Sequence, residues 1–257
     1  MRINLIIVGG SKNMDRQAFR RTPAGTGLLF DGVEVGDRCY LGSCFSLIEP
    51  TIFLTAAHCL EGIPPERVCI NHHGGPPPNL FTQVRRIEWV QGADLAVFET
   101  DAPGANWAAP FKKLKYVADL GEEICALGYP HDLTSQVPAK ETPRFFRGTV
   151  QRPFLFERSG RRYSAYELSF PCPPGLSGGP LFLADDISTV IGVVTENFET
   201  YTVQHEVVEE SRSGEVIRRE ARSVITYGVA ANIFSALSAI EKLLGRRLPD
   251  PEPECYP

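Results

Sequence analysis

Residues 174–180 read Pro-Gly-Leu-Ser-Gly-Gly-Pro, and an apolar segment begins directly after them at Leu181. The glycines around Ser177 can adopt backbone conformations closed to other residues, so successive N–H groups can converge on one point beside the serine hydroxyl. These properties suit a nucleophile loop. Taken alone, however, a Gly/Ser/Pro segment is more often an ordinary turn.

Two upstream motifs supply the groups that a serine nucleophile needs. Residues 54–59 read Leu-Thr-Ala-Ala-His-Cys, and residues 93–97 read Ala-Asp-Leu-Ala-Val. A serine hydroxyl is a poor nucleophile at neutral pH, so it requires an imidazole base, and that base requires a carboxylate to hold its tautomer. Each motif alone has a plainer interpretation, as a core histidine or a turn aspartate. Together they indicate a triad of Ser177, His58 and Asp94.

The rest of the chain favours β-strands. Its 23 glycines and 21 prolines separate short apolar segments that are rich in Val, Ile, Phe, Tyr and Thr. The predicted strands are 27–30, 44–48, 52–55, 83–90, 95–99, 123–128, 147–156, 162–169, 180–183, 189–195 and 224–229. Many short strands predict an all-β fold of the sandwich or barrel type.

Two strand pairs have the pattern of longer hairpins. The pair 147–156 and 162–169 flanks a Ser159-Gly160 turn, and the pair 203–209 and 215–224 flanks residues 211–214. The second hairpin is polar and charged, with few side chains that could fill a core. We therefore expect residues 199–223 to project from the body.

One helix is predicted at the carboxyl end. Ile233, Leu237, Ile240 and Leu244 recur at helical spacing, Asn232 can cap the segment, and Gly245 can end it.

Composition excludes several classes of function. The net charge is −5 and the arginine doublets are scattered, so no basic stripe suited to nucleic acid is present. The apolar stretches are far shorter than the roughly 20 residues needed to cross a membrane. Residues 1–10 lack a signal-peptide core, and seven cysteines make no dense disulfide framework. A cytoplasmic protein is expected, unless the given chain has lost a leader and is secreted.

The three motifs resemble the trypsin/chymotrypsin family: T-A-A-H-C at 55–59, D-L-A-V at 94–97 and G-x-S-G-G-P at 175–180, in the family's order. Gly192-Val-Val-Thr195 and Gly228-Val229 extend the likeness. The resemblance implies two packed six-stranded antiparallel β-barrels with a C-terminal α-helix.

The same resemblance implies a division of the chain. It gives an N-terminal segment at 1–24, a first barrel at 25–115, a second barrel at 116–230 with a hairpin insertion near 199–223, a helix at 231–245 and a tail at 246–257.

It also implies roles for individual residues. Ser177 attacks the scissile carbonyl, His58 takes and returns the proton, and Asp94 orients the imidazole, while the backbone N–H groups of Gly175 and Ser177 form an oxyanion hole. The implied substrate-binding residues are Pro171, Cys172, Thr195, Glu196, Asn197 and Gly228. Pro171 stands where trypsin has an aspartate, so a neutral substrate side chain is favoured, although Glu196 leaves an acidic contribution open. No metal or other cofactor is expected.

The sequence departs from the family pattern at residues that control activation of the digestive members. Leu176 replaces the aspartate that receives the new amino terminus in digestive members, so that switch cannot operate in its usual form. Residues 7–10, Ile-Val-Gly-Gly, are better explained as a strand and turn. Around the nucleophile the chain is more similar to the high-temperature-requirement proteases. The sequence ends too soon to include the PDZ domain that those proteases append, so a stand-alone peptidase is expected.

Several alternatives stay open. The chain could be a non-catalytic or latent module of the same fold that binds peptides or a dedicated partner protein; its oligomeric state is not indicated. A hydrolase with a parallel sheet is disfavoured because His58 precedes Ser177. Cys44 and Cys59 could form the family's disulfide or remain thiols. Cys69, His72 and His73 lack the second ligand pair of a zinc site.

Overall fold

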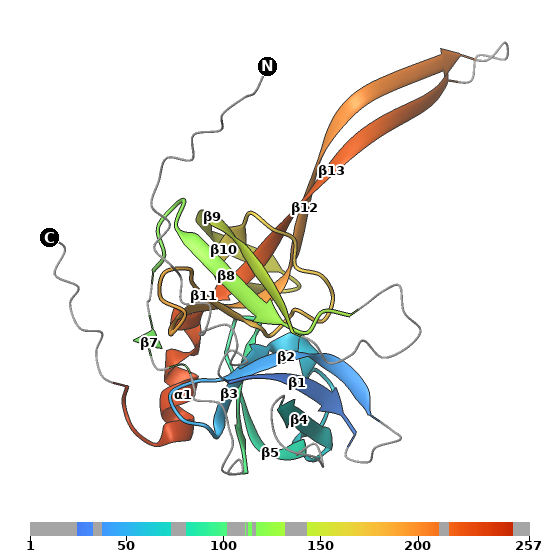
Figure 1. Ribbon diagram of the computed structural model, residues 1–257. Coiled ribbons are helices and arrows are strands. Elements are labelled where there is room, and N and C mark those ends of the chain that lie inside the picture. The colour runs from blue at the N-terminus through green and yellow to red at the C-terminus, as the bar shows by residue number, and fades with distance from the viewer. Residues whose placement is uncertain are drawn as a thin grey trace, which may run out of the picture.

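Most of the described chain is β-strand, arranged as two halves and a long projecting arm (Figure 1). The computed structural model describes residues 25–32, 38–72, 81–101, 111, 113–114, 117–131, 143–210 and 216–248. The predicted strand at residues 7–10, most of the tail and the turn at 211–214 lie outside these residues. Within them, no helix is long and apolar enough to cross a membrane.

The first half is a closed barrel. Its strands run in the order β1-β2-β3-β6-β5-β4. They are β1 (Thr26–Asp31), β2 (Cys39–Ser46), β3 (Ile52–Ala56), β4 (Val68–His72), β5 (Phe81–Trp89) and β6 (Leu95–Thr100). Short 3-10 turns, η2 (Ala57–Cys59) and η3 (Pro65–Arg67), precede β4. Phe53 stacks on Phe98 in the barrel core, with ring centroids 5.4 Å apart. Buried aromatic pairs of this kind stabilise the packing of facing strands.

The second half is a seven-stranded sheet of order β11-β8-β9-β10-β13-β12-β7, and β11 also pairs with β12. Six of its strands therefore form a ring, which confirms the predicted pair of antiparallel barrels. Its strands are β7 (Lys113–Leu114), β8 (Glu123–Gly128), β9 (Arg144–Arg158), β10 (Arg161–Leu168), β11 (Pro180–Leu183), β12 (Thr189–Glu210) and β13 (Val216–Asn232).

Two strands were not predicted from the sequence. β4 contains only two β-branched residues, Val68 and Ile70. It also precedes a proline-rich stretch whose composition predicts a loop. β7 is two residues long and pairs in parallel with Thr189 and Val190 of β12, far away in the chain. Neither strand shows the alternation of apolar and polar residues from which strands are predicted in a sequence.

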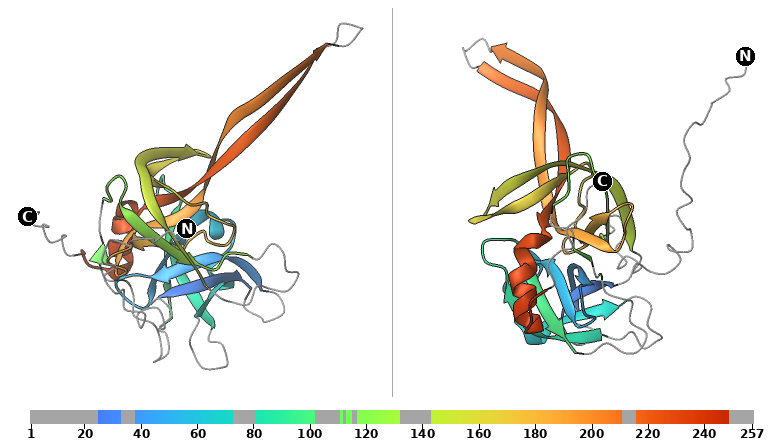
Figure 2. Two further views of the ribbon diagram at one scale, coloured as in Figure 1. Left: turned by 45° about the horizontal axis from the view of Figure 1, so that its top comes forward. Right: turned by 90° about the vertical axis from the view of Figure 1, so that its left-hand side faces the viewer.

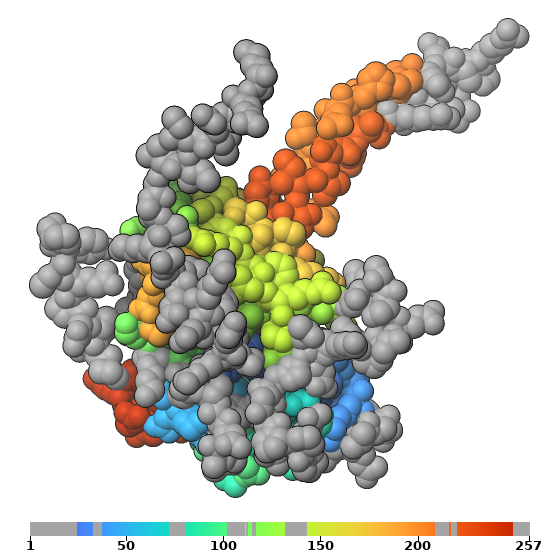
Figure 3. Space-filling model, viewed as in Figure 1, coloured from blue at the N-terminus to red at the C-terminus, as the bar shows by residue number. Residues whose placement is uncertain are grey.

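The predicted projecting hairpin is present and is longer than expected. β12 and β13 stay paired from Gly192↔Asn232 to Glu210↔Val216, so both strands run from the ring out into an arm. We define the arm as residues 199–210 and 216–226. The space-filling view shows it standing clear of the body (Figure 3).

The carboxyl-terminal helix is shorter than the predicted range 231–245. β13 continues to Asn232, the 3-10 turn η4 (Ile233–Ala236) follows, and α1 spans Leu237–Leu244. Asn232 caps η4 by accepting from the Phe234 N–H, and its amide also donates to the Tyr166 hydroxyl (2.8 Å each). These contacts hold Asn232 at the end of the strand, so the helical segment begins one residue later. Gly245, with φ +65°, ends α1 as predicted.

The two halves share one apolar core. Phe45 and Leu95 of the first barrel belong to the same buried cluster as Phe182 and Val229 of the second. Ile240 of α1 joins this cluster, and α1 runs alongside the first barrel (Figure 2). This shared core brings the loops of both halves together at one interface.

Candidate active site

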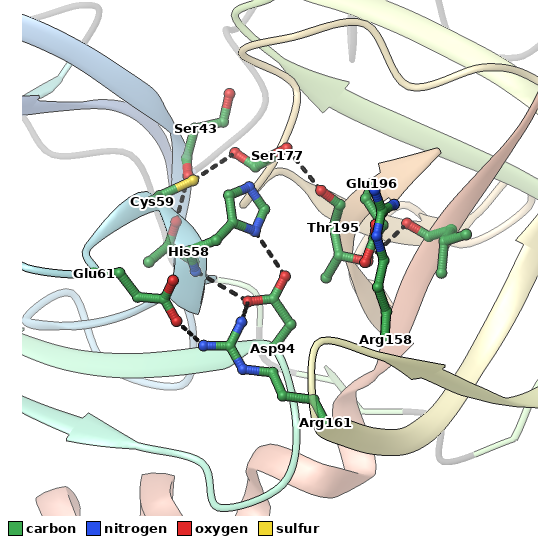
Figure 4. Close-up of polar contacts among 12 residues, drawn as sticks. Ser43, His58, Cys59, Glu61, Asp94, Arg158, Arg161, Ser177, Thr195 and Glu196 are labelled. Carbon is green, nitrogen blue, oxygen red and sulfur yellow. Dashed lines mark hydrogen bonds and ion pairs between the residues drawn. The ribbon is translucent and has the colours of Figure 1, made fainter. Parts of the chain in front are cut away.

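His58 and Asp94 come from neighbouring strands of the first barrel. η2 follows β3, Asp94 precedes β6, and Ala56 pairs with Leu95 across these two strands. The Asp94 Oδ2 lies 2.7 Å from the His58 Nδ1, and Oδ1 accepts the His58 backbone N–H at 3.0 Å. Asp94 is buried, and His58 keeps 39% of its side chain exposed. The arrangement holds one imidazole tautomer and leaves the far side of the ring toward Ser177 (Figure 4).

Ser177 comes from the second half and lies beside the His58 ring (Figure 4). Its hydroxyl donates to the backbone carbonyl of Thr195 on β12, at 2.8 Å. The expected hydrogen bond to the imidazole is therefore not the one that this structure contains. A rotation about the Cα–Cβ bond of Ser177 would redirect the hydroxyl without moving the backbone.

The raised pKa of His58 agrees with this hydroxyl orientation. Burial disfavours the charged ring, but hydrogen bonds to Asp94 and Cys59 outweigh burial and raise the pKa of His58 to about 10. A protonated imidazole has a donor at both nitrogens and cannot accept from a serine. The carbonyl of Thr195 is then the acceptor open to the Ser177 hydroxyl.

The nucleophile loop is held by the first barrel. The Gly175 carbonyl accepts from the Tyr40 and Ser43 hydroxyls (2.9 and 2.8 Å), and the Ser177 carbonyl accepts the Ser43 N–H (2.8 Å). Gly178 has φ +86°, and a Cβ there would lie 1.9 Å from the Ser43 carbonyl oxygen. Within the described residues, the N–H groups of Gly175 and Ser177 have no acceptor. Two free donors beside a serine can bind a developing negative charge.

Leu176 lies fully buried in the core of the second half. It packs in the same cluster as Leu181 and Val194. An apolar side chain in this position offers no charge to a new amino terminus, as the sequence indicates.

The residues predicted to bind substrate lie close together, but they contact one another. The Asn197 amide donates to the Cys172 carbonyl (2.8 Å) and accepts the Cys172 N–H (2.6 Å). The Gly228 N–H donates to Phe170, and a Cβ on Gly228 would lie 2.4 Å from the Cys172 sulfur. Pro171 is exposed beside them. These contacts join the two predicted pocket walls to each other.

The other two predicted substrate-binding residues belong to β12. The Thr195 hydroxyl donates to the Val229 carbonyl at 3.1 Å, inside the second half. Glu196 pairs with Arg158, and burial raises the pKa of its carboxyl. Glu196 therefore already has a positive partner.

A cavity of about 370 Å³ opens beside His58. Its lining is mostly charged: His58, Glu61, Asp94, Arg158, Ser159, Arg161, Tyr163 and Glu196. Arg161 donates from Nη1 to the Asp94 Oδ1 at 2.9 Å and pairs with Glu61. The sequence presents Arg161 only as half of an arginine doublet after a turn, which is usually a solvated position. Among the described residues, no group of three or more His, Cys, Asp or Glu side chains could hold a metal.

Tyr40 and Ser43 were also missed from the sequence, because nothing in the local pattern of β2 marks residues that contact a loop more than 130 positions away. The sequence does not decide whether Cys44 and Cys59 form a disulfide or remain thiols. In the structure both are buried free thiols.

The family model of the trypsin-like peptidase domain matches residues 42–193. A search of curated proteins returned no match.

Solved structures of similar fold include three proteases. The MamO protease domain from Magnetospirillum magneticum in its apo form is 14% identical, with a TM-score of 0.58 over 86% of this chain and 98% of that one. The Rv3671c protease from M. tuberculosis in its active form is 14% identical, with a TM-score of 0.59 over 97% and 94%. The HtrA-type protease AlgW with a decapeptide is 16% identical, with a TM-score of 0.59 over 90% and 67%. At these identities the likeness is one of fold.

Proposed function

The chain belongs to the trypsin-like peptidase family, and on that premise we propose that it is a serine endopeptidase acting through an acyl-enzyme on Ser177. The observation that carries the proposal is the buried Asp94 carboxylate hydrogen-bonded to His58, with Ser177 beside the ring. A base fixed by a carboxylate next to a serine is the arrangement that nucleophilic catalysis requires.

The proposed reaction begins with neutral His58. The Ser177 hydroxyl turns from Thr195 to the imidazole, gives up its proton, and attacks the scissile carbonyl carbon. The N–H groups of Gly175 and Ser177 stabilise the oxyanion. His58 then protonates the leaving amine, the C–N bond breaks, and an ester to Ser177 remains. Water activated by His58 hydrolyses this ester and restores the enzyme.

The proposed substrate is a peptide or protein with a neutral side chain at the cleavage site. The ion pair between Glu196 and Arg158 supports this preference, because the acidic side chain among the predicted substrate-binding residues already has a positive partner. A peptide substrate is also supported by analogy, since a protease of similar fold, AlgW, has been solved with a decapeptide.

The proposal is tested by comparing cleavage of a peptide library by the wild type and Ser177→Ala. Loss of the nucleophile in a related triad costs about 10⁶ in turnover, so we expect no measurable cleavage by the variant. Ser164→Ala, at an exposed position of β10, is the matched control and should cleave like the wild type. Equal cleavage by Ser177→Ala would contradict the proposal.

A second candidate is a latent or non-catalytic peptide-binding module. The orientation of the Ser177 hydroxyl toward Thr195 favours it. This candidate predicts that the wild type binds library peptides without cutting them and that Ser177→Ala binds them equally well.

A further inference from the structure

An arginine of the second half reaches the carboxylate that orients His58. Arg161 donates from Nη1 to the Asp94 Oδ1 at 2.9 Å, and its Nη2 pairs with Glu61, three residues after His58. Figure 4 shows Arg161 reaching toward both Asp94 and Glu61. Only 28% of its side chain is exposed. One guanidinium therefore contacts both first-barrel segments that carry the imidazole and its carboxylate.

The backbone places Arg161 there. β9 and β10 are joined by Ser159 and Gly160, which both have positive φ (53° and 77°) and make a tight reversal. Directly after Arg161, the Arg162 N–H donates to the Gly92 carbonyl at 3.0 Å, two residues before Asp94. The tip of this hairpin is thus fixed to the loop that presents the carboxylate.

The Asp94 carboxylate has donors from both halves of the molecule. Oδ2 faces the His58 Nδ1, and Oδ1 accepts from the His58 backbone N–H and from Arg161. Asp94 is 4% exposed, so few water molecules can replace a lost donor. A buried carboxylate with a missing partner is costly and can turn to find another one.

We propose that Arg161 is a positioning residue for the proposed catalytic triad, fixing Asp94 directly and the segment after His58 through Glu61. The planar fork of an arginine suits this role, since it can hold two acceptors in one geometry. The inference rests on the proposed peptidase function. It identifies the contact through which the second half of the molecule positions His58, the proposed base carried by the first half.

Arg161 has an electrostatic effect as well as a geometric one. Its guanidinium pairs with the same carboxylate that contacts the imidazole, and a positive charge there disfavours a second positive charge on the ring. The other titratable or charged groups around His58 are Cys59, Glu61, Asp94, Arg158, Tyr163 and Glu196. Loss of the Arg161 charge alone, with Asp94 still in place, would raise the His58 pKa, whereas loss of the Asp94 position would lower it. The direction of the shift therefore separates the two roles.

The test compares Arg161→Gln, Arg161→Lys and the control Arg147→Gln. Arg147 is an exposed residue of β9 whose ion pair with Glu123 involves no residue of the cavity. The first readout is the pH titration of His58 by NMR on ¹⁵N-histidine-labelled protein, with His58→Gln identifying the resonance. The second is the steady-state hydrolysis of a library-selected peptide.

For Arg161→Gln we expect the His58 titration to move to lower pH by roughly one unit, because an Asp94 carboxylate that turns away no longer stabilises the protonated ring. Turnover should fall about 10- to 100-fold with little change in KM, as for a misplaced catalytic group. Arg161→Lys should titrate like the wild type but recover turnover only in part, because one ammonium cannot hold both carboxylates in a fork. Arg147→Gln should match the wild type in both measurements.

A folded Arg161→Gln that titrates and turns over like the wild type would overturn the inference. If Arg161→Gln does not fold, Arg161→Lys decides: full wild-type turnover contradicts the need for the fork. A wild type that neither cleaves peptides nor reacts at Ser177 would refute the proposed peptidase function. The His58 titration would still test the contact between Arg161 and Asp94.

Discussion

His58 determines at which pH the proposed nucleophile can be activated. Its pKa lies above the ordinary value of 6.5 because the hydrogen bonds to Asp94 and Cys59 outweigh the effect of burial. General-base catalysis needs the neutral ring, so activity must be lost when the ring is protonated. In the structure the Ser177 hydroxyl donates to the Thr195 carbonyl oxygen and not to the imidazole.

We therefore expect kcat/KM to rise with pH along a limb that lies above the ordinary histidine range and extends toward pH 10. Raising the pH removes the imidazole proton and frees the acceptor for Ser177. Peptide hydrolysis measured across this range checks the prediction. In Asp94→Asn the limb should move to lower pH, with about a 10⁴-fold loss of turnover. A wild-type limb at or below pH 6.5 would contradict the account.

The close packing around Gly178 limits which residue type can occupy the position directly after Ser177. A Cβ there would lie 1.9 Å from the Ser43 carbonyl oxygen and 2.2 Å from the Thr55 hydroxyl oxygen. Gly178→Ala should lower the free energy of unfolding by about 4 kcal/mol, combining backbone strain and overpacking. Gly121→Ala has a similar φ of +81° with no atom within 4 Å, so it should cost only about 1–2 kcal/mol. Urea denaturation of both variants separates the two contributions, and equal losses would contradict the close packing.

At this scale the sequence predicts the residues that carry a motif and misses those that act across the fold. Ser177, His58 and Asp94 each belong to a short sequence motif that indicates a chemical role for the residue. Arg161 and Ser43 acquire their contacts only when the two halves pack together. No local pattern encodes that packing.

The arm is the most unusual element of the molecule. Its two strands carry exposed apolar side chains, among them Tyr201, Val208 and Val224, and none of the arm's side chains whose burial the structure describes belongs to the buried core. A two-stranded hairpin alone is marginally stable in water. The arm should therefore add little to the stability of the body.

We expect that replacing residues 202–223 by an Asn-Gly turn leaves the thermal unfolding midpoint within a few degrees of the wild type. Tyr201 and Val224 are paired across the strands, so a two-residue turn can join them. Circular dichroism on heating checks the result. A loss of the folded state on removing these residues would show that the arm is part of the core structure.

Element prediction worked where the pattern is local. The arm was predicted from its polar, charged composition and the helix from the spacing of its apolar residues. β7 depends on pairing with Thr189 of β12, and no local sequence pattern predicts it. The start of the helix was misplaced because Asn232 bonds to Tyr166, a partner 66 residues away.

At the scale of the whole molecule, the two halves are joined by apolar packing and by polar contacts at the nucleophile loop. One core cluster contains residues of both barrels and of α1. The Tyr40 hydroxyl of the first barrel donates to the carbonyls of Tyr129 and Gly175 in the second (2.5 and 2.9 Å). The halves should therefore unfold together.

We expect a single unfolding transition in urea, with coincident curves from tryptophan fluorescence and from far-ultraviolet circular dichroism. Both tryptophans, Trp89 and Trp107, lie within the predicted range of the first barrel, 25–115, so their fluorescence reports on the first half. Circular dichroism reports on the strands of both halves. Separate midpoints for the two probes would mean that the shared core does not couple the halves.

The central claim is that Ser177 is a nucleophile activated by His58. The most direct measurement is reaction with a fluorophosphonate, followed by intact mass and by mapping of the modified peptide. The account predicts one adduct per chain on Ser177 of the wild type, none on Ser177→Ala and strongly slowed labelling of His58→Ala. A wild type that stays unlabelled at alkaline pH, or an adduct that persists in Ser177→Ala, would contradict it.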